Sequence, residues 1–304
     1  MPALKYRTVT VRVPATTANL GPGFDCLGMA LDVWNSVHLE VSASGGSVLV
    51  TGQGADALPR DASTLVLRAV GALFQRVGAE PPELALRCRN HIPLARGLGS
   101  SAAAIVGGLV AANALLGEPL APEEVLALAV ELEGHPDNVA PALLGGCRVV
   151  VQEEGRVHTA AVPLPDALGA VVLVPDVAMP TGEARAVLPE SVPLQDAVYN
   201  VGRAALLVDA LATGRLELLA VAAQDRLHQP ARQRLFPAMK VVFRAALAGG
   251  ALAVFLSGAG SSILALTRGR EMTVAYEMLE AARQANVPAD VKVTRPSPIG
   301  AQVI

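Results

Sequence analysis

Residues 93–103 (PLARGLGSSAA) form a glycine- and serine-rich segment with the composition of an anion-binding loop. Gly97 and Gly99 permit positive φ angles and a close approach of the backbone to a ligand. Ser100 and Ser101 stand where we predict a helix to begin, so the free N–H groups of its first turn and its dipole would attract phosphate. The segment matches neither a Walker A loop nor a Rossmann fingerprint. A serine-capped turn without function explains the spacing equally well.

Two further glycine-rich loops shift this balance toward a ligand site. Residues 14–28 (PATTANLGPGFDCLG) follow a predicted strand and present Asn19 and Asp25 between glycines. Residues 256–262 (LSGAGSS) join two predicted strands and contain Gly258 and Gly260. A turn explains each loop alone, but three such loops in one chain suggest a place where backbone meets ligand.

The order of these motifs resembles that of the GHMP kinases, a superfamily of small-molecule kinases. The pattern P-x3-G-L-G-S-S-A is similar to their ATP-binding signature, and residues 14–32 and 257–266 resemble their first and third motifs. Within the superfamily, NLGPGFD and the segments EGHPDNVAP (133–141), TGEAR (181–185) and LHQPAR (227–232) are similar to the homoserine kinase family. Ser261-Ser262 in the third motif, and Asp61 with Thr64 near the expected adenine, depart from the common pattern.

The resemblance implies that the chain uses ATP and Mg²⁺. Mg²⁺ prefers carboxylate and phosphate oxygens, so we expect Ser101 and Glu133 to hold the metal, with Glu131 as the alternative carboxylate. The implied ATP-binding residues are Pro93, Leu94, Ala95, Arg96, Gly97, Leu98, Gly99, Ser100, Ser101, Ala102, Ala103, Gly258 and Gly260.

The resemblance further implies catalytic roles for Asn138, Ser101 and Glu133. Some GHMP kinases have a catalytic aspartate at the position of Asn138, and an amide cannot accept a proton. Phosphoryl transfer needs little covalent help, so the substrate hydroxyl could lose its proton to the phosphate. Whether any side chain acts as a general base stays open, and we expect His135, beside Pro136, to be structural.

The implied substrate is L-homoserine, a zwitterion with a hydroxyl group. Its ammonium group requires a carboxylate of the protein. Its own carboxylate requires a bidentate hydrogen-bond donor, and arginine suits that role best. We expect Asp25 to face the ammonium and Arg185 with Arg232 to face the carboxylate. The full set of expected substrate residues is Asn19, Asp25, Asn138, Arg185 and Arg232.

Two other functions compete with this interpretation. Another GHMP kinase with a carboxylate substrate, such as mevalonate, would leave Asp25 without a purpose, because mevalonate has no ammonium. A GHMP-like sensor without turnover should have lost the loop serines or Glu133, and both are intact.

The elements that position these motifs mix strands and helices without the regular alternation of a doubly wound sheet, which predicts an α+β fold. We predict helices over 64–77, 100–116, 122–133, 195–211, 216–227, 236–248 and 271–285. We predict strands over 8–13, 37–43, 47–51, 83–89, 148–162 (two), 170–174, 251–256, 262–267 and 290–294. The Pro-rich residues 163–169 suggest two domains, 1–163 and 164–304, for which the resemblance implies a ribosomal-S5-like and a ferredoxin-like fold.

Composition limits the partners of this chain. Hydrophobic residues make up 52% and charged residues 17%, which favours a well-buried globular fold. The net charge of −3 without a basic run argues against nucleic acid. We find no 18-residue apolar stretch and no signal peptide, so we expect no membrane contact and a cytoplasmic location. The sequence leaves open whether the chain forms a homodimer.

Overall fold

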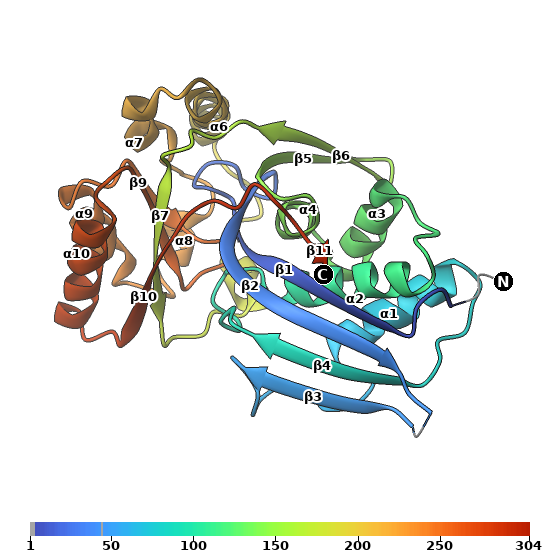
Figure 1. Cartoon of the computed structure of the whole chain (residues 1–304). Helices are drawn as coiled ribbons and strands as arrows, with labels where there is room; N and C mark the ends of the chain where they lie inside the picture. The colour runs from blue at the N-terminus through green and yellow to red at the C-terminus, as the bar shows by residue number, and fades with distance from the viewer. Residues whose placement is uncertain (1–3, 44) are drawn as a thin grey trace.

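The computed structural model describes residues 4–43 and 45–304, whose strands form two sheets (Figure 1). In the first, the order is β11-β1-β2-β4-β3, and β5 pairs with both β2 and β6. Neighbouring strands are antiparallel except β3 and β4. The strands are β1 (Thr8–Ala18), β2 (Leu27–Val41), β3 (Ser47–Gly52), β4 (Leu84–Asn90), β5 (Cys147–Glu153), β6 (Arg156–Val162) and β11 (Gln302–Val303).

Four helices belong to this part: α1 (Leu65–Arg76), α2 (Ser100–Leu115), α3 (Pro122–Glu133) and α4 (Pro136–Leu144). Helix α2 packs on β1, β2 and β11, and its other neighbours are the remaining three helices. It is apolar all round, as expected of a helix enclosed on every side. Gly108 lets it approach α1, because a Cβ there would press on the carbonyl oxygen of Val66. This packing fixes the N-terminus of α2, where the serines stand.

The second sheet has the order β10-β7-β9-β8 and is antiparallel throughout. Its strands are β7 (Gly169–Pro175), β8 (Ala253–Leu256), β9 (Ile263–Thr267) and β10 (Ala289–Thr294). Helices α9 (Met239–Ala248) and α10 (Glu271–Gln284) pack on each other and on this sheet. The remaining helices lie between β7 and α9 in the chain: α5 (Thr181–Ala186), α6 (Leu194–Thr213), η1 (Leu216–Leu218), α7 (Leu219–Ala222) and α8 (Gln229–Arg232).

Residues 163–168 connect β6 of the first sheet to β7 of the second. We therefore keep the division at 163/164 as a proposal. One strand crosses this division: β11 belongs to the C-terminal half of the chain and pairs with β1 at Val11 and Arg12.

Most predicted elements are confirmed, and the four largest errors have physical reasons. Strand β2 begins at Leu27, ten residues before its predicted start, because residues 27–31 are buried on both faces and show no alternation. Helix α4 was not predicted: Pro136 reads as a turn, yet it occupies the first helical turn, where proline is tolerated. Helix α5 was missed as well, and it is only six residues long.

The fourth error is the helix predicted over 216–227. The chain forms η1 and α7 to Ala222 and then an irregular segment. Asp225 explains the break. Its buried carboxylate accepts the backbone N–H groups of Leu227, His228 and Gln229 at 2.9, 3.1 and 2.7 Å, which starts α8 in a new direction.

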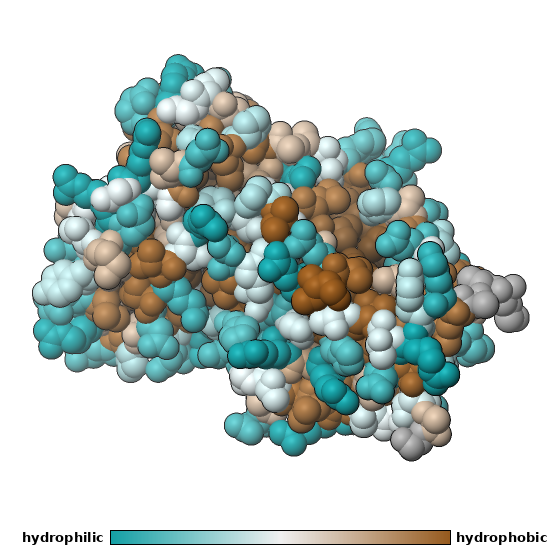
Figure 2. All heavy atoms as spheres, in the orientation of Figure 1, coloured by the Kyte–Doolittle hydropathy of each residue, from teal (hydrophilic) through white to brown (hydrophobic). Residues whose placement is uncertain are grey.

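The core consists of two clusters of buried apolar side chains. The larger fills the space between the first sheet and α1–α4 and continues to one face of the second sheet and to α6 and α7. The smaller lies between the other face of the second sheet and α9 and α10. Figure 2 shows hydrophilic side chains over much of one face, with apolar patches between them. Within residues 4–43 and 45–304, no helix has the length and hydropathy needed to cross a membrane.

Candidate active site

The three glycine-rich loops of the sequence meet in one place. The backbone N–H of Thr16 donates to the carbonyl of Leu98 at 3.2 Å, which joins the first loop to the second. Ser257 Oγ donates to the carbonyl of Gly97 at 2.6 Å, which joins the third loop to the second. A Cβ at Gly97 would collide with the carbonyl of Ser257. Glycine is therefore required there by close approach as well as by its φ of 72°.

The second loop presents the N-terminus of α2 to the pocket. Gly99 precedes the helix with φ 66° and ψ 31°, and no described side chain caps this end. The first-turn N–H groups are therefore available to an anion, together with the helix dipole. A Cβ at Gly99 would strike the hydroxyl of Thr16, so the loop has no room for a larger residue.

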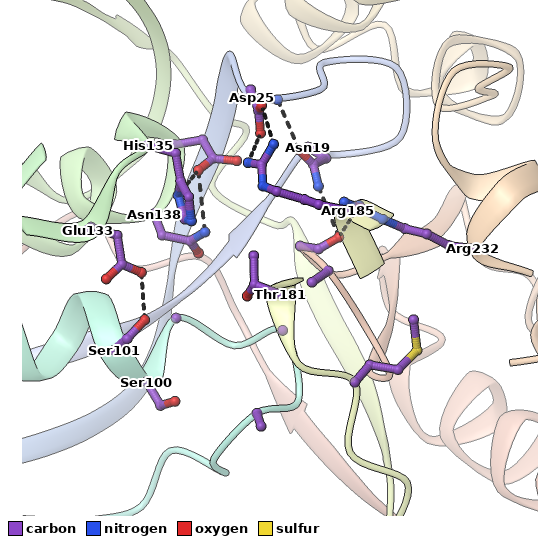
Figure 3. Close-up of a pocket in the computed structure, with 17 residues that line it drawn as sticks. Asn19, Asp25, Ser100, Ser101, Glu133, His135, Asn138, Thr181, Arg185 and Arg232 are labelled. Carbon is purple, nitrogen blue, oxygen red and sulfur yellow. Dashed lines mark hydrogen bonds and ion pairs between the residues drawn. The ribbon is translucent and has the colours of Figure 1, made fainter. Parts of the chain in front are cut away.

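Glu133, at the C-terminal end of α3, faces Ser101. The Ser101 hydroxyl donates to Glu133 Oε1 at 2.5 Å, as Figure 3 shows. Burial raises the pKa of Glu133. Glu131 lies outside the pocket, in an ion pair with Arg76 at 2.6 Å, and its side chain is 59% exposed. Of the two glutamates, Glu133 is therefore the one that lines the pocket.

Asp25 and Arg185 form a bidentate ion pair across the pocket (Figure 3). Arg185 donates from Nη1 to Oδ2 at 2.9 Å and from Nη2 to Oδ1 at 2.7 Å. The pair joins the first loop to α5, and the hydrogen bonds to Asp25 raise the pKa of Arg185. The prediction that Asp25 receives an ammonium stays a prediction, but the structure does bring a carboxylate and guanidinium groups to one site.

Arg232 is 2% exposed. Its Nε donates to the carbonyl of Ala184 at 3.2 Å, and its Nη1 donates to the carbonyl of Gly258 at 3.0 Å and lies 3.1 Å from His228 Nδ1. Burial and the nearby charge of Arg185 lower its pKa to about 10, so it stays charged at neutral pH. Its Nη2 makes no hydrogen bond within the described residues and is available to an anion in the pocket.

Asn19 and Asn138 have fixed orientations. Asn19 donates from Nδ2 to the carbonyl of Gly258 at 2.9 Å and accepts the backbone N–H of Asp25 at 3.0 Å. Asn138 accepts from the Thr16 hydroxyl at 2.8 Å, so its amide nitrogen turns toward Asp137. These two amides connect the first loop to the third loop and to α4.

His135 bonds Asp137 through Nδ1 at 3.0 Å, and this hydrogen bond raises its pKa. Asp137 is 3% exposed. Both residues line the pocket, and Figure 3 shows His135 beside Glu133.

One pocket collects most of the expected residues. It is lined by Asn19, Asp25, Ala95, Gly97, Gly99, Ser100, Ser101, Glu133, His135, Asp137, Asn138, Met179, Thr181, Arg185, Arg232, Gly258 and Ala259. Sequence reasoning missed Thr181, Met179, Asp137 and Ala259 as lining residues. The sequence could have indicated Thr181 and Asp137 as lining residues, because they are polar residues inside the recognised motifs. It did not indicate Met179 and Ala259.

Several expected ATP-binding residues do not line this pocket. Leu98 and Ala102 are buried in the core, and Gly260 packs against Gly97. Arg96 turns to the second sheet, where it donates to the carbonyls of Pro175 at 2.8 Å and Asp176 at 3.1 Å. These residues support the loop from behind, and the groups that it leaves available to an anion are its backbone and the two serines.

An apolar cavity of about 250 Å³ adjoins the same serines. Leu94 and Ala103 of the expected ATP-binding set belong to its wall, along with Leu58, Leu65 and Leu86. Thr64 lines it, whereas Asp61 does not. A planar aromatic group attached to a phosphate at the α2 N-terminus would fit this arrangement.

Comparisons with known proteins agree with this geometry. The family model for the GHMP kinase N-terminal domain matches residues 64–146, and that for the C-terminal domain matches residues 207–285. The chain is 48% identical to a homoserine kinase of Moorella thermoacetica, covering 97% of this chain and 99% of the relative. It is 50% identical to a homoserine kinase of Gloeobacter violaceus, covering 90% of each chain.

Solved structures give the same result. A crystal structure of homoserine kinase from Cytophaga hutchinsonii matches with a TM-score of 0.90 at 34% identity, over 99% of both chains. An L. major mevalonate kinase matches with a TM-score of 0.74 at 15% identity, over 97% of this chain and 99% of that one, which shows the shared fold alone. The expected α+β, two-domain architecture is confirmed, and the chain belongs to the homoserine kinase family of the GHMP kinases.

Proposed function

We propose that this chain transfers the γ-phosphoryl group of ATP to the hydroxyl of L-homoserine, giving O-phospho-L-homoserine and ADP in a step toward threonine. The relatives named homoserine kinase support the proposal. The single observation that carries it in the structure is the juxtaposition of Asp25 with Arg185 and Arg232, beside an uncapped helix N-terminus.

The nucleotide occupies two adjoining spaces in this proposal. The triphosphate lies at the N-terminus of α2, where backbone N–H groups and the hydroxyls of Ser100 and Ser101 can bind it. The adenine enters the apolar cavity behind these serines, whose wall is largely aliphatic. Backbone atoms supply most phosphate contacts, which explains why the loop contains glycines and no lysine.

Ser101 and Glu133 would hold Mg²⁺ together with phosphate oxygens. Within the described residues, no group of three or more histidine, cysteine or acidic side chains could hold a metal alone. Mg²⁺ usually takes only one or two oxygen ligands from the protein, and phosphate oxygens of the substrate complete its coordination. When bound, the ion would neutralise charge that develops on the phosphates.

Homoserine would enter by exchange with the Asp25–Arg185 ion pair. Its ammonium would replace Arg185 at Asp25, and its carboxylate would replace Asp25 at Arg185. Arg232 would add its free Nη2 to the same carboxylate. Because each charge keeps a partner of opposite sign, the exchange leaves no buried charge unpaired.

The hydroxyl oxygen would attack the γ-phosphorus, and the bond from that phosphorus to the ADP oxygen would break. The hydroxyl proton would pass to the transferred phosphoryl group, so no dedicated base is required. Asn138 would orient the hydroxyl, because Thr16 fixes its amide and leaves the nitrogen as donor. The roles of Asn138, Ser101 and Glu133 therefore are positioning and charge stabilisation.

The test is a coupled ADP-release assay with homoserine, mevalonate, galactose and shikimate. The ammonium–Asp25 pair is worth at least about 2 kcal/mol. We therefore expect kcat/KM for homoserine to exceed that for mevalonate by at least about thirtyfold. Equal or greater activity on mevalonate would instead support the carboxylate-substrate alternative, which no observation of the site favours at present.

We also propose a cytoplasmic location. The three cysteines are free, and Cys88 and Cys147 are buried with pKa values raised by burial to about 11 and about 12. Unpaired, unreactive thiols are typical of proteins in a reducing compartment.

A further inference from the structure

His228 is a buried histidine that stands directly before helix α8, behind the pocket. It is 0% exposed and does not line the pocket itself. Each of its ring nitrogens nevertheless contacts a part of the site. Nε2 lies 2.7 Å from the carbonyl oxygen of Gly21, and Nδ1 lies 3.1 Å from Nη1 of Arg232. His228 therefore connects the first glycine-rich loop, which carries Asp25, to an arginine of the pocket.

These two contacts fix the protonation state of the ring. A carbonyl oxygen can only accept, so Nε2 carries a hydrogen and donates it to Gly21. A guanidinium can only donate, so Nδ1 has no hydrogen and accepts from Arg232. The imidazole is therefore neutral and in a single tautomer. Burial lowers the pKa of His228, which agrees with a neutral ring at neutral pH.

Asp225 is the acidic group nearest to this ring, with Oδ2 at 3.6 Å from Nε2 of His228. Its charge favours a protonated ring and so opposes the effect of burial. The same carboxylate already accepts three backbone N–H groups of the residues that follow it and Nδ2 of Asn200. The positive charge of Arg232 beside Nδ1 disfavours a second proton. Both the hydrogen bonds and this charge keep the ring neutral.

The neutral ring helps to set the plane of the Arg232 guanidinium. A guanidinium has five N–H groups in one plane. Its Nε donates to the carbonyl of Ala184, and its Nη1 donates to the carbonyl of Gly258 and to Nδ1 of His228. Within the described residues, His228 is the only side chain that accepts from Arg232. The three acceptors together fix the plane and leave the two N–H groups of Nη2 for the pocket.

Phe24 cannot replace this contact. Its ring lies 5.4 Å from Cζ of Arg232 and 5.2 Å from the His228 ring, on which it stacks at 30°. The face of an aromatic ring attracts a guanidinium but does not fix the direction of each N–H group. Without Nδ1 of His228, one buried N–H group of Arg232 would lose its acceptor, and the guanidinium would turn to find another.

We infer that His228 is a positioning residue for the kinase reaction: its neutral imidazole, with the hydrogen on Nε2, holds Arg232 in the plane that directs Nη2 at the substrate carboxylate. The inference rests on the proposed function, in which this carboxylate belongs to homoserine. His228 itself contacts no substrate, since it does not line the pocket, and it acts through Arg232.

Two substitutions separate the two hydrogen bonds of the ring. The amide oxygen of His228→Asn can take the place of Nδ1 and accept from Arg232, but the bond to Gly21 is lost. The amide of His228→Gln can reach the place of Nε2 and keep the bond to Gly21, but it offers no acceptor to Arg232. If His228 only filled space, His228→Gln should be the milder change, because glutamine is larger than asparagine. If His228 positions Arg232, His228→Asn should be the milder one.

The assay compares kcat/KM for homoserine with kcat/KM for 3-aminopropan-1-ol, which lacks the carboxylate. His228→Gln should lower this preference about tenfold, mainly through a higher KM for homoserine, because Arg232 loses one of its three acceptors. His228→Asn should keep most of the preference. His38→Gln is the matched control, since His38 bonds Thr10 through Nδ1 at 2.8 Å on the first sheet, away from the pocket. Unchanged ADP affinity, measured by calorimetry, would show that the variants are folded.

Nitrogen NMR of isotope-labelled wild-type protein tests the tautomer without any substitution at His228. The spectrum should show a hydrogen on Nε2 and none on Nδ1 at neutral pH. A hydrogen on Nδ1, a His228→Gln variant that keeps the wild-type preference, or a His228→Asn variant that loses as much as His228→Gln would each overturn the inference alone. A wild-type protein that does not prefer homoserine to 3-aminopropan-1-ol would refute the proposed function, and the inference with it.

Discussion

Asp25→Asn is the substitution that most directly probes how the site distinguishes its substrate. The change preserves the shape of the side chain. It also preserves the hydrogen bond that the backbone N–H of residue 25 donates to Asn19 at 3.0 Å. It removes the negative charge that pairs with Arg185 at 2.7 Å and, in our proposal, with the substrate ammonium. The fold should survive, because the Asp25 and Arg185 side chains are 36% and 37% exposed and such a pair contributes only about 0.2–1 kcal/mol.

The loss should appear in catalysis. Removing one partner of a hydrogen-bonded charge pair that is buried in a complex costs about 2–5 kcal/mol. Because Asp25 is partly exposed, we take the lower end, about 2 kcal/mol, which is roughly thirtyfold in kcat/KM for homoserine. The KM for ATP should change little, since Asp25 lies outside the phosphate loop.

The assay compares homoserine with 4-hydroxybutyrate, which has the same hydroxyl and carboxylate but no ammonium. Wild-type protein should prefer homoserine, and Asp25→Asn should lose that preference. Asp32→Asn is a matched control, because Asp32 is 37% exposed and pairs with Arg295 at 3.2 Å, away from the pocket. An Asp25→Asn variant that keeps the wild-type preference would refute the ammonium assignment.

Three further predictions concern ATP, metal and pH. Gly99→Val should abolish ADP binding measured by calorimetry while the protein stays folded, because its side chain would displace Thr16 and crowd the phosphates; Gly71→Ala, which has open space, should bind ADP normally. Glu133→Gln should lower kcat and raise the Mg²⁺ concentration needed for half-maximal rate, whereas Glu131→Gln should do neither; the opposite result would exchange their roles. Without ligands, Glu133→Gln should also raise the melting temperature at neutral pH. The folded-state pKa of Glu133 is raised above 4.5, so this group favours folding in its protonated form and that contribution is lost as pH rises through the folded pKa. The stability gain of the variant should therefore shrink toward acid pH, and a gain that is independent of pH would contradict the burial argument.

Local chemistry predicted much of the site. Gly97, Gly99 and the two serines have a spacing that needs close backbone approach and a helix start, and the structure has both. Glycine and proline affect the chain through their own backbone dihedral angles, so the local conformation that they favour can be predicted without knowledge of the fold. The strand and helix periods along most of the chain were readable for the same reason.

Contacts between distant segments could not be predicted in the same way. The bond from Thr16 to Asn138 spans 122 positions, and Arg96 reaches the carbonyl of Pro175, 79 positions away. Asp225 ends a predicted helix because its carboxylate is buried, which no local pattern reveals.

The most direct measurement of the central claim is a competition for limiting ATP. Wild-type protein receives equal amounts of L-homoserine, mevalonate and 4-hydroxybutyrate with Mg²⁺, and the phosphorylated products are separated and identified by phosphorus NMR and mass. The account predicts O-phospho-L-homoserine as the dominant product, because homoserine alone among the three can pair with both Asp25 and the arginines. A product mixture dominated by phosphomevalonate or by phosphorylated 4-hydroxybutyrate, or ADP release without any phosphorylated amino acid, would contradict it.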